Sequence, residues 1–138
     1  MEDNMDIKRI FDIYRRHSVI TTDSRDCPPG SIFVALRGEK FDGNKFAATA
    51  LRNGCSYAVV DNPEYATDDR CLLVPDALQV LKELAREHRR QYGIPVIGIT
   101  GTNGKTTTKE LIAAVLAERF SVHCTQGNFN NDVGVPKT

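Results

Sequence analysis

An apolar run that leads directly into a glycine-containing loop, and from there into a helical pattern, constrains this chain most. The run spans residues 96–100, the loop spans residues 101–107, and apolar residues recur at helical spacing from Leu111 to Leu116. A short, almost wholly apolar run favours a central parallel strand. A strand, a loop ending in Gly-Lys-Thr and a helix, in this order, are typical of a phosphate-binding loop. The sequence therefore predicts an α/β fold in which a P-loop, Rossmann-like domain begins near residue 93.

The residue types in the loop have physical reasons. Gly101 and Gly104 let the backbone turn tightly and bring its N–H groups to phosphate oxygens. The following helix adds unpaired amides and the positive end of its dipole. We expect Lys105 to place a charge at the β- and γ-phosphates, as the candidate catalytic residue, and the Thr106 hydroxyl to be a ligand for Mg²⁺. The candidate cofactor-binding residues are Gly101, Thr102, Asn103, Gly104, Lys105, Thr106 and Thr107.

The simpler interpretation of this loop is a glycine turn between a strand and a helix, with Lys105 solvated. The spacing is also a variant of the general G-x-x-x-x-G-K-[ST] pattern, because the first glycine of that pattern would fall at Ile99. The strand before the loop and the helix after it favour the phosphate-binding interpretation.

Helical and strand-like patterns alternate along the rest of the chain, which favours an α/β architecture. We predict helices over residues 5–14 and 44–53. A third helix is predicted from Asp76, which fits a capping box with Gln79, to near Gly93. Short strands are predicted over residues 32–36, 57–60, 71–74 and 121–125. The Gly-Ile-Pro at residues 93–95 is interpreted as a junction, which gives a small N-terminal domain, 1–92, and an incomplete second domain, 93–138.

Composition excludes several classes of protein. The 138 residues carry 18 Lys+Arg and 18 Asp+Glu, a net charge of zero that argues against nucleic-acid binding by bulk charge. No apolar run approaches the ~20 residues of a membrane-spanning helix, and the charged N-terminus has no signal-peptide pattern. The four cysteines form no C-x-x-C pair, which argues against a zinc or thioredoxin-type site. We expect a cytoplasmic protein with reduced thiols.

Four segments resemble the Mur ligase family, and together they cover nearly the whole chain. Residues 99–108 resemble the ATP loop of these ligases and of their folylpolyglutamate synthase relatives. Residues 22–25, Thr-Asp-Ser-Arg, resemble the uridine-binding signature of the muramyl-peptide ligases, and residues 30–43 resemble the strand and loop that follow it. Residues 127–136, GNFNNDVGVP, are typical of the branch that joins D-alanyl-D-alanine to UDP-N-acetylmuramoyl-tripeptide.

The resemblance implies a monomeric, ATP- and Mg²⁺-dependent ligase of peptidoglycan synthesis that works through an acyl phosphate. It assigns the uridine end of the substrate to Thr22, Ser24, Glu39, Lys40 and Phe41, and the muramyl-peptide channel to Asn128, Asn130 and Asn131. Each set also has a purely local interpretation. Residues 22–25 suit an Asx or Ser/Thr turn, and the asparagines suit a polar turn before a buried Val-Gly-Val. Asn44 and Lys137 depart from the family, which often has His and Leu at these positions.

Only about thirty residues follow Thr107, so we expect an N-terminal fragment of a three-domain ligase that is inactive alone. Two other functions remain open. One is the sister ligase that adds the third residue of the peptide. The other is a non-catalytic P-loop regulator that senses ATP or GTP, in which residues 22–25 would be only a turn. A plain α/β interaction module without a ligand would not explain why Lys105 lies in a glycine loop between a strand and a helix.

Overall fold

The computed structural model describes residues 3–17, 19–127, 129 and 131–138, with the side chains of the first helix from Lys8 onward. The chain divides into two compact units, Met1–Ala85 and Arg86–Thr138. We describe each unit by itself. No helix among the described residues is long and apolar enough to cross a membrane.

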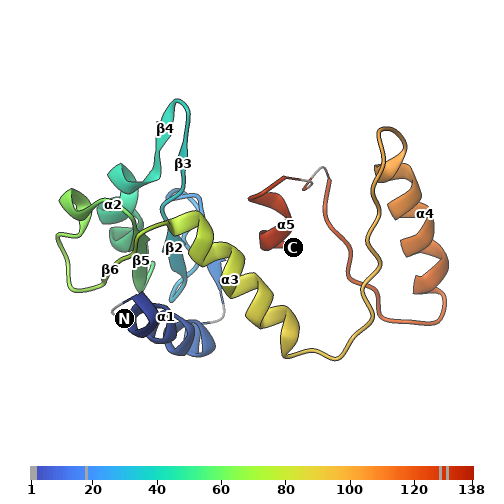
Figure 1. The fold of residues 1–138 in the computed structure, drawn as a ribbon, viewed down its shortest axis with the longest axis horizontal. Helices are drawn as coiled ribbons and strands as arrows, with labels where there is room; N and C mark the ends of the chain where they lie inside the picture. The colour runs from blue at the N-terminus through green and yellow to red at the C-terminus, as the bar shows by residue number, and fades with distance from the viewer. Residues whose placement is uncertain (1–2, 18, 128, 130) are drawn as a thin grey trace. The chain divides into compact units, whose positions relative to one another are not determined.

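A parallel four-stranded sheet, in the order β1-β2-β5-β6, forms the centre of the N-terminal unit (Figure 1). A two-stranded antiparallel hairpin, β3–β4, extends from it. In chain order the elements are α1 (Asp3–His17), β1 (Ile20–Thr21), β2 (Ile32–Val34), β3 (Arg37–Gly38), β4 (Phe41–Asp42), the 3-10 turn η1 (Gly43–Phe46), α2 (Ala47–Arg52), β5 (Tyr57–Val60), η2 (Pro63–Tyr65), β6 (Cys71–Leu73) and α3 (Ala77–Arg90).

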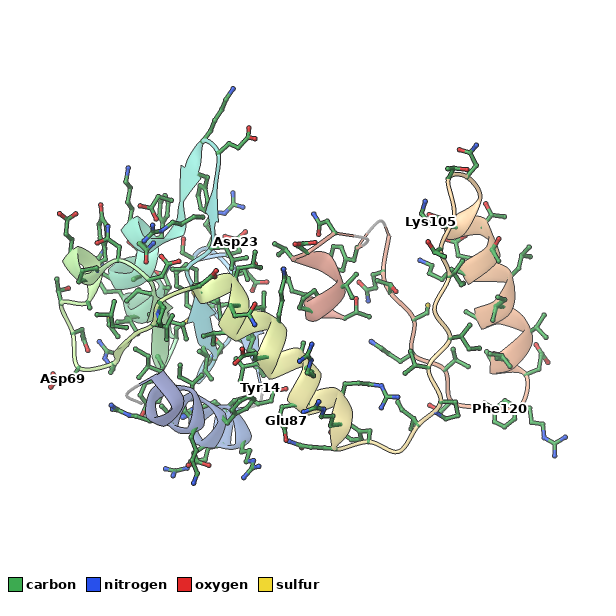
Figure 2. All side chains as sticks on the ribbon, viewed as in Figure 1. Tyr14, Asp23, Asp69, Glu87, Lys105 and Phe120 are labelled. Carbon is green, nitrogen blue, oxygen red and sulfur yellow. The ribbon has the colours of Figure 1, made fainter. Side chains whose placement is uncertain are left out.

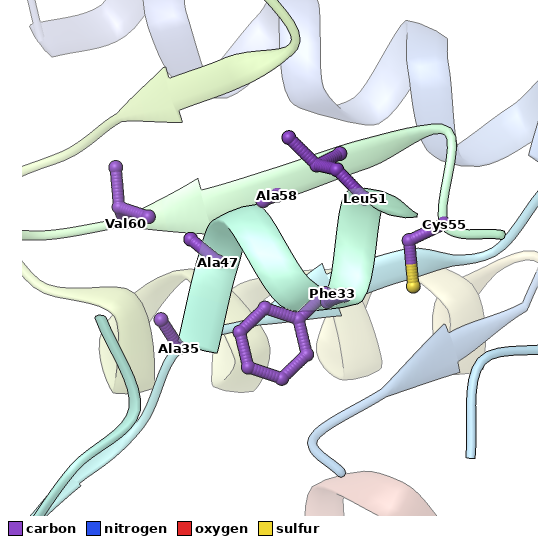
Figure 3. Close-up of a cluster of buried hydrophobic side chains, with 8 residues drawn as sticks. Phe33, Ala35, Ala47, Leu51, Cys55, Ala58 and Val60 are labelled. Atoms are coloured by element: carbon purple, nitrogen blue, oxygen red, sulfur yellow. The ribbon is translucent and has the colours of Figure 1, made fainter. Parts of the chain in front are cut away.

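Both faces of the sheet are covered, as expected for parallel strands. On one face, Phe33 of β2 and Ala58 of β5 pack with α2 in a cluster of buried side chains (Figure 3). The alternate residues of these strands point to the opposite face, on which α1 and α3 lie (Figure 1). Ile10 of α1 and Leu84 of α3 are each 1% exposed. Apolar residues that recur at helical spacing in α1 and α3 thus contribute to the core of this unit.

Most predicted elements of the N-terminal unit are confirmed. The strand over residues 57–60 has the predicted bounds, and the predicted cap of α3 is present, because the Gln79 N–H donates to Asp76 Oδ1 at 2.9 Å. The Gln79 side chain contacts Glu83 at 2.9 Å instead of completing a capping box. The helix predicted over residues 44–53 begins as the turn η1, because the Asp42 side chain accepts the Asn44 N–H there.

The second unit begins within α3, and its described residues contain two further helices, α4 (Lys105–Ala117) and α5 (Gly134–Lys137). The helix after the glycine loop is confirmed, but the strands predicted over residues 96–100 and 121–125 are wrong for this structure. Val96 is 65% exposed and Ile97 is 59% exposed. A parallel strand requires a neighbouring strand for its hydrogen bonds, and the described residues of this unit supply none. For the same reason the apolar face of α4 remains unburied.

Candidate functional site

The loop over residues 101–107 has the backbone conformation that its glycines were predicted to provide. Gly101 has φ +147° and Gly104 has φ +76°, a region that favours glycine. Gly104 is also the N-terminal cap of α4, and its carbonyl accepts the Thr108 N–H at 2.9 Å. The amides of residues 105–107 therefore belong to the first turn of α4, the part of a helix whose N–H groups and dipole favour anions. These features fit a bound polyphosphate.

Two lysines one turn apart on α4 hold this region. Lys105, labelled at the start of the helix in Figure 2, donates from Nζ to the Gly101 carbonyl and so closes the loop. Lys109 donates to the carbonyls of Thr125 at 2.6 Å and of Gly127 at 3.3 Å. An ammonium group that faces backbone carbonyls can be drawn to a more highly charged phosphate without crossing an apolar barrier. The sequence analysis missed Lys109, although its spacing of four residues from Lys105 places both on one helix face.

The asparagine-rich segment is described only in part. Asn128 and Asn130 lie outside the described residues. Asn131 is exposed, and its Oδ1 accepts the N–H groups of Gly134 at 2.7 Å and of Val133 at 3.3 Å. This is the local turn role considered for it from the sequence. The predicted buried Val-Gly-Val is wrong, because Gly134 is buried whereas Val135 is 60% exposed.

Loops that follow β1, β2 and β5 gather at the carboxyl edge of the parallel sheet, the edge at which α/β proteins bind ligands. After β1, the Thr21 hydroxyl accepts the Asp23 N–H at 3.1 Å, and Asp23 Oδ1 accepts the Arg25 N–H at 3.0 Å. The segment 22–25 is therefore a Ser/Thr turn followed by an Asx turn. Ser24 is 9% exposed, and its carbonyl accepts a bond from the Asn53 side chain at 2.7 Å.

An ion pair fixes the outer part of that turn. Arg25 donates to Asp23 from Nε at 2.9 Å and from Nη2 at 2.6 Å, and this hydrogen bonding raises the pKa of Arg25. Asp23 is labelled at this edge in Figure 2. The local interpretation of the segment is thus present in the structure, and it leaves Thr22 half-buried at the edge where a ligand can reach it.

Three of the five residues predicted to bind the uridine end of a substrate lie together on the β3–β4 hairpin. Glu39 and Lys40 form its exposed tip, and Phe41 begins β4. The Phe41 ring is 53% exposed and stacks on the Phe46 ring, with centroids 5.5 Å apart and planes 11° apart. Exposed, fixed aromatic rings beside a lysine suit the binding of a base joined to phosphates. Phe46 was not singled out from the sequence.

A polar network fixes the base of the hairpin. Asn44 is fully buried, and its side-chain amide donates to Asp42 Oδ1 and Asp61 Oδ1, both at 2.8 Å. The Asp61 N–H donates to Asn44 Oδ1 at 3.0 Å. Hydrogen bonding from Asn44 lowers the pKa of Asp42. The sequence analysis noted Asn44 only as a departure from the family and did not single out Asp61, although a polar residue at the carboxyl end of a buried strand marks a ligand-side loop in such folds.

Two cavities of the N-terminal unit lie elsewhere. They have volumes of about 370 and 450 Å³ and share Tyr57, the first residue of β5, so they lie at the opposite edge of the sheet. Both are shallow depressions beside α1 and α2, and neither contains a predicted site residue.

A metal site made by the described residues alone is not present, because they contain no group of three His, Cys, Asp or Glu side chains able to hold an ion. The Thr106 hydroxyl is thus a candidate for one oxygen ligand among several that the nucleotide and water would provide. The loop over residues 101–107 and the residues predicted to bind uridine belong to different units.

Comparison with known proteins places both units in one family. The family model described as "Mur ligase family, catalytic domain" matches residues 16–89, and the model described as "Mur ligase middle domain" matches residues 99–138. A UDP-N-acetylmuramoyl-tripeptide–D-alanyl-D-alanine ligase from Synechocystis is 47% identical over 121 residues, covering 86% of this chain and 27% of the relative. A UDP-N-acetylmuramoyl-L-alanyl-D-glutamate–2,6-diaminopimelate ligase from Chlorobium phaeobacteroides is 41% identical over 107 residues, covering 72% of this chain and 20% of the relative.

A solved structure gives the same result. The MurF ligase from Thermotoga maritima, in complex with ADP, superimposes with a TM-score of 0.80 and 37% identity, over 86% of this chain and 28% of that one. The chain thus spans about a quarter of the length of these relatives.

Proposed function

Because the chain belongs to the Mur ligase family, we propose that it forms the UDP-substrate-binding domain, residues 1–92, and the beginning of the ATP-binding domain, residues 93–138, of a cytoplasmic peptidoglycan-precursor ligase. The proposed enzyme acts as a monomer and joins D-alanyl-D-alanine to UDP-N-acetylmuramoyl-tripeptide. The observation that carries the proposal is the exposed loop 101–107, whose amides and lysine converge at the start of α4. The 47% identity to a ligase of that name supports this choice of substrates.

The proposed reaction has two balanced steps. A carboxylate of the tripeptide nucleotide attacks the γ-phosphorus of ATP, which gives an acyl phosphate and ADP. The amine of D-alanyl-D-alanine then attacks the acyl carbon, loses a proton and displaces inorganic phosphate, which forms the amide. In-line transfer of this kind depends mainly on positioning and charge neutralisation.

Each predicted residue has a place in this scheme. Lys105 and the amides of residues 101–107 bind the β- and γ-phosphates, and Thr106 offers one oxygen to Mg²⁺. Thr22, Ser24 and the hairpin residues Glu39, Lys40 and Phe41 bind the uridine end. Asn128, Asn130 and Asn131 line the path of the muramyl-peptide.

The direct test measures phosphate release from ATP by the complete gene product with UDP-N-acetylmuramoyl-tripeptide. D-alanyl-D-alanine, lysine, diaminopimelate or no acceptor is added in separate reactions. We expect release that depends on both the tripeptide nucleotide and D-alanyl-D-alanine. Release that requires the dipeptide nucleotide and a diamino acid would assign the protein to the sister ligase, an alternative supported by the 41% identity to such an enzyme.

Two variants test the role of the loop. Lys105→Ala should lower kcat by about 100-fold or more, the usual cost of losing a charge-stabilising donor in a transfer site. Arg119→Ala removes one positive charge beyond the other end of α4, at an exposed position, and should leave kcat unchanged. Equal rates for the two variants would refute the assignment of Lys105.

The regulator alternative predicts a different ligand response. If the protein is the proposed ligase, UDP-N-acetylmuramoyl-peptide should raise its melting temperature at concentrations above the dissociation constant, and the rise should continue with the logarithm of the concentration. A regulator would respond to ATP or GTP without responding to the uridine nucleotide, and it would show no acceptor-dependent phosphate release.

A further inference from the structure

Asp61, the residue directly after β5, joins three elements through its side chain and backbone. Its Oδ1 forms an ion pair with Arg37 Nε at 2.7 Å and accepts a hydrogen bond from Asn44 Nδ2 at 2.8 Å. Its carbonyl accepts a hydrogen bond from Arg37 Nη2 at 2.7 Å. Its Oδ2 accepts the Ala77 N–H of α3 at 3.3 Å. The Asp61 side chain is 12% exposed. Asp61 is therefore a hub between the sheet, α3 and the β3–β4 hairpin.

Both strands of the hairpin are tied to this hub. Arg37, the first residue of β3, reaches Asp61 directly. Asp42, the last residue of β4, is linked through the Asn44 amide, which contacts both carboxylates. We call these contacts of Arg37, Asp42, Asn44 and Asp61 the hairpin latch.

Besides the latch, the hairpin is held by the Phe41–Phe46 ring stack and the Gly43 N–H bond to the Leu36 carbonyl, and its own pairing is short. It consists of two residue pairs, Arg37 with Asp42 and Gly38 with Phe41, and an isolated two-stranded ribbon is at best marginally stable in water. Its tip residues are exposed, so they add no buried core. The latch holds the Arg37–Asp42 pair at the base of this ribbon, where a small rotation would move the tip most.

We propose that Asp61 is a positioning residue for substrate binding: through the hairpin latch it holds Glu39, Lys40 and Phe41 where the uridine end of the substrate binds, without contacting the substrate itself. This inference rests on the proposed function of those three residues. Ordering the loop before the ligand arrives removes that entropic cost from binding, so the latch strengthens the affinity for the uridine nucleotide. It leaves the phosphate loop of the second unit unchanged.

Steady-state kinetics of the complete gene product test the effect on binding. Asp61→Ala should raise KM for UDP-N-acetylmuramoyl-tripeptide about tenfold, which corresponds to about 1.4 kcal/mol, with kcat and KM for ATP within about twofold of wild type. Asp68→Ala is the matched control. Asp68 also pairs with an arginine, at 2.8 Å, but its partner Arg70 lies before β6 and away from the hairpin. An unchanged KM in Asp61→Ala, or an equal rise in Asp68→Ala, would overturn the inference.

A second readout tests the latch without a ligand. In the ¹⁵N-labelled 138-residue chain, the backbone order parameters of Gly38, Glu39 and Lys40 should fall below about 0.6 in Asp61→Ala, while those of Val34 and Ala58 in the sheet remain at wild-type values. A hairpin that stays ordered in Asp61→Ala would show that Asp61 does not hold it in place. If Asp61→Ala fails to fold, Arg37→Ala removes the partner that is 49% exposed and is judged by the same two readouts.

The two readouts separate the inference from the proposed function. If the wild-type protein binds no uridine nucleotide, the proposed role of the hairpin residues fails and the affinity effect fails with it. The order parameters then still decide whether Asp61 holds the hairpin. If the hairpin loosens while KM for the uridine nucleotide stays unchanged, the latch exists but the positioning role is wrong.

Discussion

Replacing Gly43 by alanine gives a sharp test of how the hairpin joins the sheet. A Cβ atom at this position would lie 2.6 Å from the Leu36 carbonyl oxygen, 2.8 Å from the Leu36 nitrogen and 3.0 Å from the Ala35 carbonyl carbon. All three are backbone atoms, so no change of side-chain rotamer relieves the overlap. The backbone at residue 43 must move away from the backbone of residues 35–36. This movement lengthens the hydrogen bond from the Gly43 N–H to the Leu36 carbonyl, whose length is 2.8 Å.

The expected loss of stability follows from three terms. Overpacking against a fixed backbone costs about 1–3 kcal/mol, and weakening one backbone hydrogen bond costs up to about 1 kcal/mol. Alanine also restricts the unfolded chain, which offsets about 0.4–1 kcal/mol. We therefore expect Gly43→Ala to lower the free energy of unfolding of the N-terminal unit by about 2 kcal/mol.

Urea titration followed by NMR measures this for one unit at a time. The intensities of the Val34 and Ala58 amide signals report the N-terminal unit alone, which avoids mixing two transitions. Gly38→Ala, in the same hairpin, is the control, because an added Cβ there meets no atom within 4 Å. Its stability should stay within about 1 kcal/mol of wild type. Unfolding midpoints for Gly43→Ala that match those of Gly38→Ala would refute the close-approach reasoning.

Three further predictions concern the core and the titrating groups. Phe33→Ala, at a position 1% exposed, should cost about 3–5 kcal/mol of unfolding free energy by urea titration, and a cost below about 1 kcal/mol would contradict the packing. Burial raises the pKa of Cys27 to about 12, so iodoacetamide at pH 8 should alkylate the exposed Cys124 well before Cys27, as followed by peptide mass spectrometry; equal rates would contradict this. Because hydrogen bonding from Asn44 lowers the pKa of Asp42 below 3.8, its carboxylate stabilises the fold above that pH and loses this contribution as the pH falls through the lower folded value. The stability gap between wild type and Asp42→Asn should thus shrink below pH 3.8, and a gap independent of pH would refute it.

Local patterns in the sequence were sufficient for much of the N-terminal unit. The apolar run at residues 57–60 predicted β5, because a parallel strand that is covered on both faces is apolar at consecutive positions. The periodicity after Asp76 predicted α3, because a helix that buries one face repeats its apolar residues with the helical period. The tight turn of the loop over residues 101–107 could also be predicted, since glycine is the residue type that readily adopts the positive φ found at positions 101 and 104.

Other predictions required partners that a pattern does not contain. The run at residues 96–100 has the composition of a central strand, yet it forms none in the described structure because no neighbouring strand accepts its hydrogen bonds. Asn131 resembles a substrate-binding motif, while its Oδ1 accepts bonds from the turn that it begins. In both cases the local pattern was present in the sequence, but the contacts that the residues make in the structure could not be read from it.

The sequence by itself thus determined the family, the alternation of helices and strands, and the glycine conformations of the phosphate loop, all of which depend on residues close together in the chain. Only the tertiary structure decided that Asp61 would meet Arg37 and Asn44, residues 24 and 17 positions away. Long-range contacts of this kind depend on strand order and register, which bring the ends of β2 and β5 to one edge of the sheet. The side chains that secure the hairpin therefore became visible only when the parallel sheet had aligned those ends.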